Sequence, residues 1–562
     1  MIKKLIFPKA FLILFIIPIS LYSQQENVPI EHDVYTFLKE MCIKQIINSV
    51  HDDNPIMSRY EIKKHLENID DHRNKLSRTE LKILDKYQDE FFDKGADSSN
   101  TYQIFGTSTG FSKKVSDLFS DKMKYTYSYR EENINYNLEI LGRIMYGQNL
   151  KPFVMNSQLY DIGFRFRGTV LDNLGYSLTV QKGGVSGSHD YAYTIEPRLK
   201  YNFKYFERIE NIDNYDFAEG YLRYYTEPVE DMKMSFQIGR EKLKLGYGYG
   251  SKIVLSGDHP VLDFFKMDFN YGIFSFTSVH ASTVGEFYWD REQNYTKQIA
   301  YNRFKLSFNN LFDFGFGEAI VYSGRGIDLA YLNPFVFYKF VEMSLQDRDN
   351  GVVFLDIQTR AVPNLELQAT FFLDENILSH LQELDLFSNK TAYQLGAFWY
   401  SPFSIDDLSV IFEYTRIRPY VYSHTNTKNS YTSYSQSLGH RIGPNADEIL
   451  LKASYNINEK MRLNAEAQFV RSGENLYDAL GNVVFNAGGD YLFGHREVID
   501  ANKINFLEGE RINQNIFILN FKYEPIRELW LDIVFQYSIR NNLYRDFKSY
   551  SSLAYIRLLF NL

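Results

Sequence analysis

The sequence predicts a mainly β protein: a large antiparallel transmembrane β-barrel of about 18 strands, preceded by a small N-terminal periplasmic α-helical domain. Three observations lead to this fold class. From about residue 122 onward, apolar and polar residues alternate with a period of two. The connections between these segments alternate between short and long. Aromatic residues make up 17% of the chain, and a membrane barrel needs many of them for its two aromatic girdles.

The N-terminus has a pattern of its own. Residues 1–23 combine two early lysines with a short apolar run and are typical of a secretory signal peptide that is cut near Ser23. Residues 24–94 then show the apolar spacing of three short amphipathic helices, none of them apolar enough to span a bilayer. We expect a helical domain that lies in water, packed on itself or on the barrel rim. Two of its helices open with capping boxes, Ser58-Arg-Tyr-Glu61 and Ser77-Arg-Thr-Glu80.

The barrel prediction covers residues 122–562, with residues 95–121 as a linker that leads into it. In Leu365–Asp374 every odd-numbered residue is apolar and most even-numbered ones are polar; Met461–Phe469 and Leu529–Arg540 repeat the pattern. Successive side chains of a strand point to opposite faces, so each strand has one apolar and one polar face. The strands run to roughly 9–12 residues, which is the length needed to cross a bilayer at a tilt.

The connections distinguish a barrel from a soluble sandwich. A membrane barrel has tight periplasmic turns and long outer loops, whereas a sandwich has no reason to alternate them. We expect an even number of strands, roughly 18 to 20, with both chain ends in the periplasm. The short connections are Glu227–Asp231, Asn270–Gly272, Asn309–Asp313, Ala361–Asn364, Ser401–Asp406, Asn456–Glu459 and Glu524–Glu528. The long ones are Arg240–Val261, Ser282–Gln298, Gly324–Asn350, Asp374–Asn389, Ile417–Asp447 and Ser472–Ile512.

Composition excludes several functional classes. The net charge of −9 and the absence of a basic run argue against a nucleic-acid partner. The mean hydropathy of −0.34 argues against a bundle of membrane helices. No His pair at metal-ligand spacing and no phosphate-binding glycine loop occurs, so we expect no metal, cofactor or catalytic residue. The G-x-S-x-G match at residues 106–110 has no helix pattern after it and is interpreted as chance, and Cys42 as a buried helix residue.

Two stretches put charged and aromatic residues beside glycines at the end of a strand. The first is Gly239–Asp263, GREKLKLGYGYGSKIVLSGDHPVLD, which is too polar for a soluble core. An Arg fork suits a carboxylate, and Tyr rings offer stacking platforms for sugars. We expect the stretch either to bind carbohydrate or to form a buried ion-pair network that rigidifies the lumen. Its candidate residues are Arg240, Tyr247, Tyr249, Asp258, His259 and Asp263.

The second stretch is Gly315–Pro334, GFGEAIVYSGRGIDLAYLNP, and the same two alternatives apply to it. Its Gly324-Arg-Gly326 step suggests a close backbone approach. Two of the long outer loops also mix Tyr with Ser, Thr, Asn and Gly, as a glycan-binding surface or an ordinary outer loop does. The candidates in the second stretch are Glu318, Arg325, Asp328, Tyr331 and Asn333, and those in the loops are Tyr420, Tyr422, Tyr431, Tyr434, Tyr477 and Tyr491.

Longer segments show a family resemblance. GREKLKLGYGYGSKIVLSGDHPVLDFFKMDF, GFGEAIVYSGRGIDLAYLNP, and VPIEHDVYTFLKEM followed by SRYEIKKHL resemble the capsule assembly Wzi family in its Bacteroidetes-type form, over most of the mature chain. The resemblance implies an outer-membrane barrel of about 18 strands with a periplasmic helical bundle. It also implies a lectin-like, non-enzymatic role: binding capsular or other surface polysaccharide and holding it at the cell surface.

Three other functions stay open at this point. One is a porin-like channel with a charged lumen. Another is a structural accessory of an outer-membrane secretion or gliding system, whose helical domain docks a periplasmic or outer-membrane export partner. A third is a surface enzyme that uses carboxylates such as Asp258 or Glu318. In every case we expect outer-membrane lipids around the barrel.

Overall fold

The computed structural model describes residues 24–48, 50–92, 101–105, 118–131, 133–202, 207–209, 212–285, 295–308, 311–345, 348–374 and 382–562. The predicted signal peptide, most of the predicted linker and the G-x-S-x-G match at 106–110 lie outside the described residues. Among the described helices, none has both the length and the apolar character that a membrane crossing requires.

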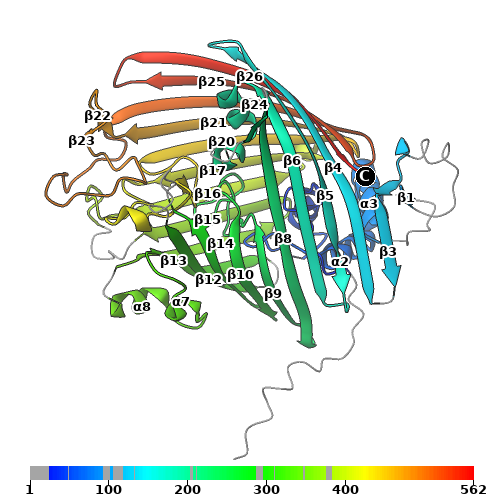
Figure 1. The fold of residues 1–562 in the computed structure, drawn as a ribbon. Coiled ribbons are helices and arrows are strands. Elements are labelled where there is room, and N and C mark those ends of the chain that lie inside the picture. Colours follow the sequence, from blue (N-terminus) through cyan, green and yellow to red (C-terminus); the bar gives the residue numbers. More distant parts are fainter. Residues whose placement is uncertain are drawn as a thin grey trace, which may run out of the picture.

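The described strands form a closed antiparallel barrel, as the period-two alternation predicts (Figure 1). Eighteen of them close the ring within the described residues, and strand β26 pairs with both β25 and β4. The wall strands are β4 (Ile134–Lys151), β5 (Met155–Val170), β6 (Leu174–Gly187), β8 (Ile212–Val229), β9 (Met232–Glu241), β10 (Leu262–Tyr271), β11 (Phe274–Val284), β12 (Thr296–Phe308), β13 (Phe312–Ser323), β14 (Asn350–Val362), β15 (Leu365–Asp374), β16 (Thr391–Tyr400), β17 (Leu408–Ile417), β20 (Ala446–Asn458), β21 (Met461–Glu474), β24 (Glu510–Ile526), β25 (Leu529–Asn542) and β26 (Phe547–Asn561).

Shorter strands lie beside the ring. Strand β3 pairs with the first five residues of β4, Ile134–Leu138, and β7 pairs with the start of β8. The remaining three pairs form small separate sheets, one of which, β1 with β2, is parallel. The short strands are β1 (Thr101–Gln103), β2 (Met123–Tyr125), β3 (Tyr127–Glu131), β7 (Glu207–Ile209), β18 (Thr432–Ser433), β19 (Gln436–Ser437), β22 (Leu476–Tyr477) and β23 (Val483–Phe485).

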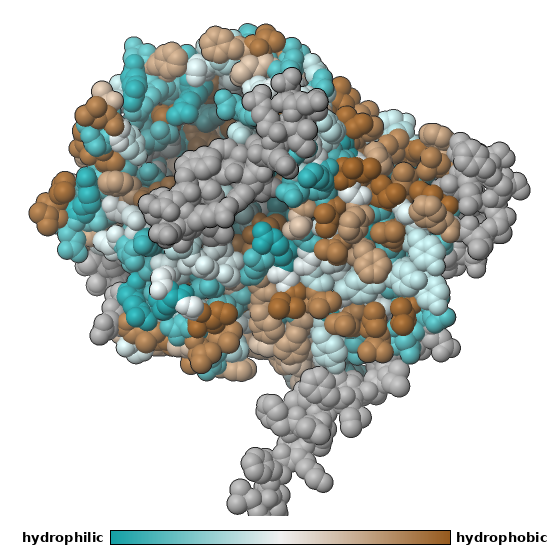
Figure 2. All heavy atoms as spheres, in the orientation of Figure 1, coloured by the Kyte–Doolittle hydropathy of each residue, from teal (hydrophilic) through white to brown (hydrophobic). Residues whose placement is uncertain are grey.

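Over most of the wall, polar side chains face the lumen and apolar side chains face outward. In β15, Glu366 and Gln368 are buried inside, whereas Leu367 and Phe371 are 44% and 38% exposed on the outside. Such outward apolar side chains appear as brown patches on the side of the barrel in Figure 2. This arrangement is the reverse of a soluble protein and suits a wall that meets lipid.

The two ends of the barrel differ. Every predicted short connection joins two neighbouring wall strands at one end, here named the short-turn end, and both β4 and the C-terminal strand β26 begin or finish there. The long connections gather at the opposite, long-loop end and carry further helices (Figure 1). These are α5 (His189–Ile195), α6 (Leu199–Asn202), α7 (Leu329–Leu332), α8 (Tyr338–Ser344) and η8 (Thr427–Asn429), while η7 (Pro402–Ser404) lies in a short turn.

The N-terminal helices form at the predicted places. Helices α1 (Val34–Ile43), α2 (Arg59–Asp70) and α3 (Arg78–Phe91) share one apolar core, which also contains the buried Cys42, and η3 (Arg73–Lys75) joins the last two. Both predicted capping boxes are present. The helices sit in the mouth of the barrel at the short-turn end (Figure 1), where Tyr400 of β16 joins their core. The expected packing of the helices on one another is therefore confirmed, and the segment is inserted into the mouth and does not sit on its rim.

Candidate binding site in the barrel lumen

The N-terminal segment, residues 24–92, is fixed to the barrel wall by buried ion pairs. Lys39 Nζ donates to Glu366 Oε2 of β15 at 2.6 Å. Asp53 accepts from Lys305 Nζ of β12 at 2.7 Å and also pairs with Arg303 of the same strand. Burial opposes the charge of Asp53, but Arg303 and Lys305 outweigh it and lower its pKa well below the ordinary value. The segment is thus held to the inner wall by charges that only the folded protein pairs.

A second filling of the lumen comes from the long-loop end. The connection between β9 and β10, residues 242–261 and here named the lumen loop, folds into the barrel and buries Leu243, Ile253 and Val254 in an apolar core with inward side chains of the wall. The Gly246 amide donates to the Asp53 carbonyl at 2.9 Å, which joins the loop to the N-terminal segment. The stretch was expected to be too polar for a soluble core, and inside the barrel its aliphatic residues form an apolar core with the wall.

The glycine-rich sequence of the lumen loop has a conformational reason. Gly246 and Gly248 have φ values of +90° and +138°, which side chains with a Cβ rarely adopt. The turn that results brings the amides of Tyr249 and Gly250 to Glu413 of β17, at 2.7 and 3.0 Å. The pattern GYGYG therefore builds a tight turn against the wall.

The connection between β17 and β20, residues 418–445 and here named the cap loop, closes over the lumen loop. The Tyr422 hydroxyl donates to the Ile253 carbonyl at 2.8 Å, and the Tyr431 hydroxyl donates to the Val254 carbonyl at 2.9 Å. Tyr420, Tyr422 and Tyr431 are fully buried. These three loop tyrosines lock the cap loop in place and offer no ring to a sugar at the surface.

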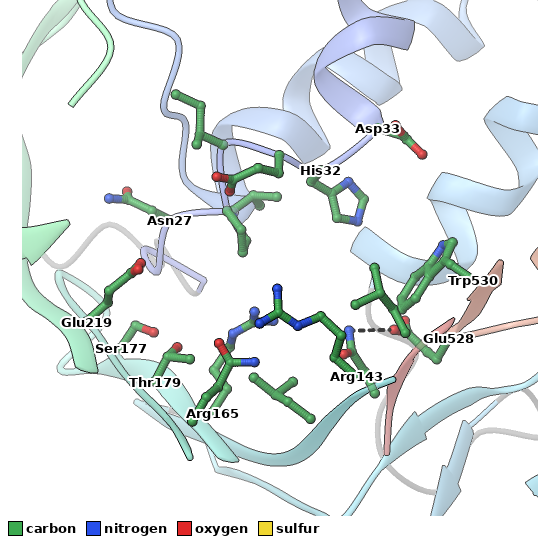
Figure 3. Close-up of a pocket in the computed structure, with 18 of the residues that line it drawn as sticks. Asn27, His32, Asp33, Arg143, Arg165, Ser177, Thr179, Glu219, Glu528 and Trp530 are labelled. Carbon is green, nitrogen blue, oxygen red and sulfur yellow. Dashed lines mark hydrogen bonds between the residues drawn. The ribbon is translucent and has the colours of Figure 1, made fainter. Parts of the chain in front are cut away.

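The lumen contains a large cavity, of about 650 Å³, on the side of β4 to β9 and β24 to β26. Its roof comes from residues Asn27–Asp33 of the N-terminal segment and its walls from inward side chains of the strands. Figure 3 shows Arg143 and Arg165 pointing into the cavity from the sheet. In the same view Ser177, Thr179 and Glu219 lie on one side, Glu528 and Trp530 lie on the other, and Asn27, His32 and Asp33 lie above.

The arginines of the cavity are held by carboxylates. Arg165, Arg198 and Arg557 are each held by one carboxylate, which sets the direction of their remaining N–H groups. Arg143 is held by both Asp161 and Glu196 and also donates to the Tyr215 hydroxyl. Burial opposes the charge of Glu196, but Arg198 and Arg143 outweigh it and keep its pKa below the ordinary value. At the short-turn end, burial and the nearby Glu90 raise the pKa of Glu528 to about 7. The contacts are Arg143 to Asp161 at 2.6 Å, Arg165 to Glu139 at 3.3 Å, Arg198 to Glu196 at 2.9 Å and Arg557 to Asp532 at 2.9 Å.

Comparisons with known proteins identify the family. The model of the family described as capsule assembly protein Wzi matches residues 159–491. The chain belongs to the Wzi family. A solved structure of Escherichia coli Wzi, described as an outer membrane protein involved in group 1 capsule assembly and as a carbohydrate-binding β-barrel, shares 12% identity at a TM-score of 0.55. That match covers 95% of this chain and 99% of the other, and it supports the fold.

Two further solved barrels are more distantly similar. Acinetobacter baumannii OccAB2 has 8% identity and a TM-score of 0.44, with 76% of this chain and 98% of that chain covered. Pseudomonas aeruginosa OprD has 9% identity and a TM-score of 0.40, with 76% and 95% covered. No curated protein sequence matches the chain.

In this Wzi-family barrel, the first predicted set of site residues is distributed between the outer face of the wall and the lumen filling. Arg240 and Asp263 lie opposite one another on β9 and β10 and pair at 2.8 Å, 52% and 59% exposed on the outer face, on the same side of the strand as Ile238 and Phe265. They therefore do not belong to the lumen network that the sequence suggested. Asp258 is exposed on the lumen loop and accepts from the Ser251 hydroxyl at 2.7 Å.

The other three residues of the first set lie inside. The Tyr247 ring is buried beside the Arg303 guanidinium, 5.1 Å from its centroid. Tyr249 donates its hydroxyl to Glu366 Oε1 at 2.8 Å, and the buried His259 ring contacts the Pro260 carbonyl through Nδ1 at 2.7 Å. These side chains stabilise the lumen filling, and they do not line the large cavity.

The second predicted set gathers outside the barrel. Glu318 is on the outward face of β13, where it accepts from the Tyr338 amide of α8 at 2.9 Å. Arg325 donates to both carboxylate oxygens of Asp349, which also accepts from the Tyr331 hydroxyl at 2.8 Å. Asp328 caps the start of α7 by accepting from the Ala330 amide, and Asn333 accepts from the Phe335 amide. The set builds a folded loop and does not enter the lumen.

The cavity residues were not selected from the sequence. Arg165, Glu219 and Arg557 occupy polar positions in alternating strands, where a charge is ordinary for a barrel lumen. A signal was present in the β5 sequence, where Asp161, Arg165 and Arg167 share one face. It did not indicate a cavity, because the space depends on which loops fold inward. Among the described residues, no group of three or more His, Cys, Asp or Glu side chains is placed to hold a metal ion.

Proposed function

We propose that this protein binds surface or capsular polysaccharide at the outer membrane and aids its assembly or attachment there, without catalysing a reaction. The observation that carries the proposal is the filled lumen. The N-terminal segment, the lumen loop and the cap loop are joined through buried hydrogen bonds inside one rigid wall. A wide transport pore needs an open lumen, whereas a binding platform needs fixed groups. Family membership and the description of E. coli Wzi as carbohydrate-binding favour the same function.

The cavity supplies the chemistry that a polar glycan needs, and we propose it as the binding site. Arg165, held by Glu139 through one N–H group, can direct further N–H groups at sugar oxygens or at a uronic-acid carboxylate. Arg143, fixed by Asp161 and Glu196, adds positive charge beside it. Ser177 and Thr179 add hydroxyls, and Glu219 can accept from sugar hydroxyls. The groups come from separate strands and face one space, as recognition of a branched polar ligand requires (Figure 3).

A binding measurement tests the site directly. Purified mature protein in detergent micelles is titrated with the polysaccharide of its own strain. We expect Arg165→Ala to weaken binding while the barrel keeps its heat-modifiable migration on a gel. The matched control is Arg73→Ala, which removes an exposed arginine, 41% accessible, from the helical segment. Equal binding by both variants and the parent would place the glycan elsewhere.

The cellular test is deletion of the gene. We expect capsule to be released into the medium while its synthesis continues, because the attachment step is lost. Complementation with the parent gene is the control. If the deletion strain keeps its full amount of cell-bound polysaccharide, the attachment function is wrong.

The cavity also favours a second candidate, a narrow channel. Its lining includes Glu528 of a short turn, and Glu241 and Lys242 where β9 passes into the lumen loop. Planar-bilayer recordings distinguish the two functions, because a channel gives steady, high conductance and a binding platform does not. An enzyme has less support, since Asp258 lies on the lumen loop and Glu318 on the outer face of the wall, where they form no acid–base pair.

We also propose the organisation in which residues 24–94 form the helical domain, residues 95–121 the linker and residues 122–562 the barrel, after removal of a signal peptide near Ser23. The helices at the short-turn end then face the periplasm, where an export partner would meet them. Loss of copurifying envelope proteins after removal of residues 27–94 would support such a partner. An unchanged set would argue against it.

A further inference from the structure

The outer face of the barrel carries polar side chains where its neighbours are apolar. Ser278, Asn302 and Glu318 lie directly opposite one another on β11, β12 and β13. All three point outward, because they alternate with inward residues. Lower on β13, Phe314 takes the same outward direction and is 45% exposed. A bare row of such groups against lipid would leave a carboxyl and an amide without hydrogen-bond partners in hydrocarbon.

A folded loop covers this row. Residues 324–345, here named the outer flap, contain α7 and α8 and lie outside the wall beside β12 and β13 (Figure 1). The Tyr338 amide donates to Glu318 Oε2 at 2.9 Å, and Asn302 Nδ2 donates to the Pro334 carbonyl at 3.3 Å. The Phe335 ring stacks on Phe276 of β11, with centroids 6.4 Å apart. The outer flap therefore supplies the hydrogen bonds that lipid cannot give.

The buried side of the outer flap combines hydrogen-bonding side chains with the apolar Val341 and Leu345, while its exposed side carries large apolar side chains. On α8, Tyr338 and Glu342 face the barrel and are 1% exposed, whereas Phe340 and Met343 are 72% and 58% exposed. Leu329 of α7 is 77% exposed. In water an amphipathic helix exposes its polar side, whereas α8 exposes large apolar side chains. Figure 2 shows brown, apolar atoms at the lower left, where Figure 1 places α7 and α8.

We propose that the outer flap is immersed in the outer leaflet of the membrane, where lipid acyl chains contact Leu329 and Phe340. Two observations select lipid as the occupant. The exposed side chains of the flap continue the apolar outer face of the strands that it covers, including Phe314 and Leu355. The flap also encloses Glu318, so an apolar surface replaces a charged one at that height. The arrangement serves the barrel in the membrane and does not depend on polysaccharide binding.

Spin-label accessibility of the full chain in lipid vesicles tests this placement. Single nitroxides are attached at Leu329→Cys and Phe340→Cys, and each variant is first checked for heat-modifiable migration. Phe314→Cys on the outward face of β13 is the lipid control, and Leu480→Cys, at a side chain 89% exposed in the β22–β23 hairpin, is the water control. Cys42 is buried, so the parent protein measures the background labelling.

Immersed labels collide often with oxygen and seldom with a water-soluble nickel chelate. We expect both flap positions to match Phe314→Cys, with an oxygen-to-nickel collision ratio several-fold above that of Leu480→Cys. Ratios equal to the water control would overturn the proposal, because the flap would then lie in the aqueous phase. Protection from both probes would overturn it as well, since a second copy or another protein would then cover the flap.

Discussion

The sharpest prediction concerns Asp53, through which the N-terminal segment is fixed to the wall. Asp53 is 5% exposed and accepts from Lys305 Nζ at 2.7 Å, and it pairs with Arg303, which is 2% exposed. Asp53→Asn keeps the shape of the side chain and removes its charge. Lys305 and Arg303 would then be buried with one negative partner fewer.

The structure sets the size of the effect. Removing one member of a buried ion pair costs about 3–5 kcal/mol. Arg303 keeps Asp356 at 2.7 Å, so we expect the lower end, about 3 kcal/mol, for opening of the segment. That free energy corresponds to roughly a 100-fold larger population of the open form. The open form exposes the backbone amides of α1 and α2 to exchange.

Hydrogen exchange followed by mass spectrometry measures this opening in detergent-solubilised protein. We expect exchange in α1 and α2 to accelerate about 100-fold while the amides of the wall strands stay protected. The control is Asp85→Asn, which removes an exposed ion pair with Arg73, 55% and 41% accessible, of the kind that contributes about 0–1 kcal/mol. If Asp53→Asn accelerates exchange no more than this control, the buried network does not hold the segment.

Three further predictions follow from other parts of the molecule. The pKa of Glu528 is raised to about 7, so the folded state keeps its proton at pH values where the unfolded state has lost it, and stability falls as pH rises from the ordinary Glu value toward 7. Glu528→Gln should therefore be more stable than the parent by about 1–3 kcal/mol at pH 8 and equal to it at pH 4. Urea unfolding at the two pH values measures the difference. Tyr422→Phe should lower the free energy of unfolding by about 1–2 kcal/mol, because the Ile253 carbonyl loses its buried donor, and an unchanged denaturation midpoint would contradict the cap-loop contact. Replacing the outer flap with a short Gly-Ser turn should destabilise the barrel in vesicles, and adding Glu318→Leu should restore part of the loss; no rescue would mean that covering Glu318 is not what the flap contributes.

Local sequence was sufficient wherever a short-range rule applies. The strict alternation in Leu365–Asp374 predicted which side chains face the lumen, because successive side chains of a strand point to opposite faces. Ser58 and Ser77 predicted the starts of two helices, because a capping box uses atoms only three residues apart. Turn and loop lengths predicted the ring of strands, since each short connection forces its two strands to be antiparallel neighbours.

The residues of the candidate site could not be predicted by rules that relate residues only a few positions apart. Glu318 and the lumen residue Tyr247 occur in similar glycine-rich stretches, yet one lies on the lipid side of the wall and the other inside it. For a residue in a strand, a shift of one residue in the strand register changes whether its side chain faces the lumen or the lipid. For a residue in a long loop, the path of the loop decides it.

Sequence by itself determined the fold class, the apolar outward face of the wall and the three N-terminal helices. Tertiary structure alone decided where the long loops go: the lumen loop into the barrel, the outer flap over its outside, and an open space left beside Arg143 and Arg165. The physical reason is the sequence distance over which the determining interactions act. Alternation and capping depend on neighbours a few residues apart, whereas a cavity is the volume that segments from distant parts of the chain leave unfilled.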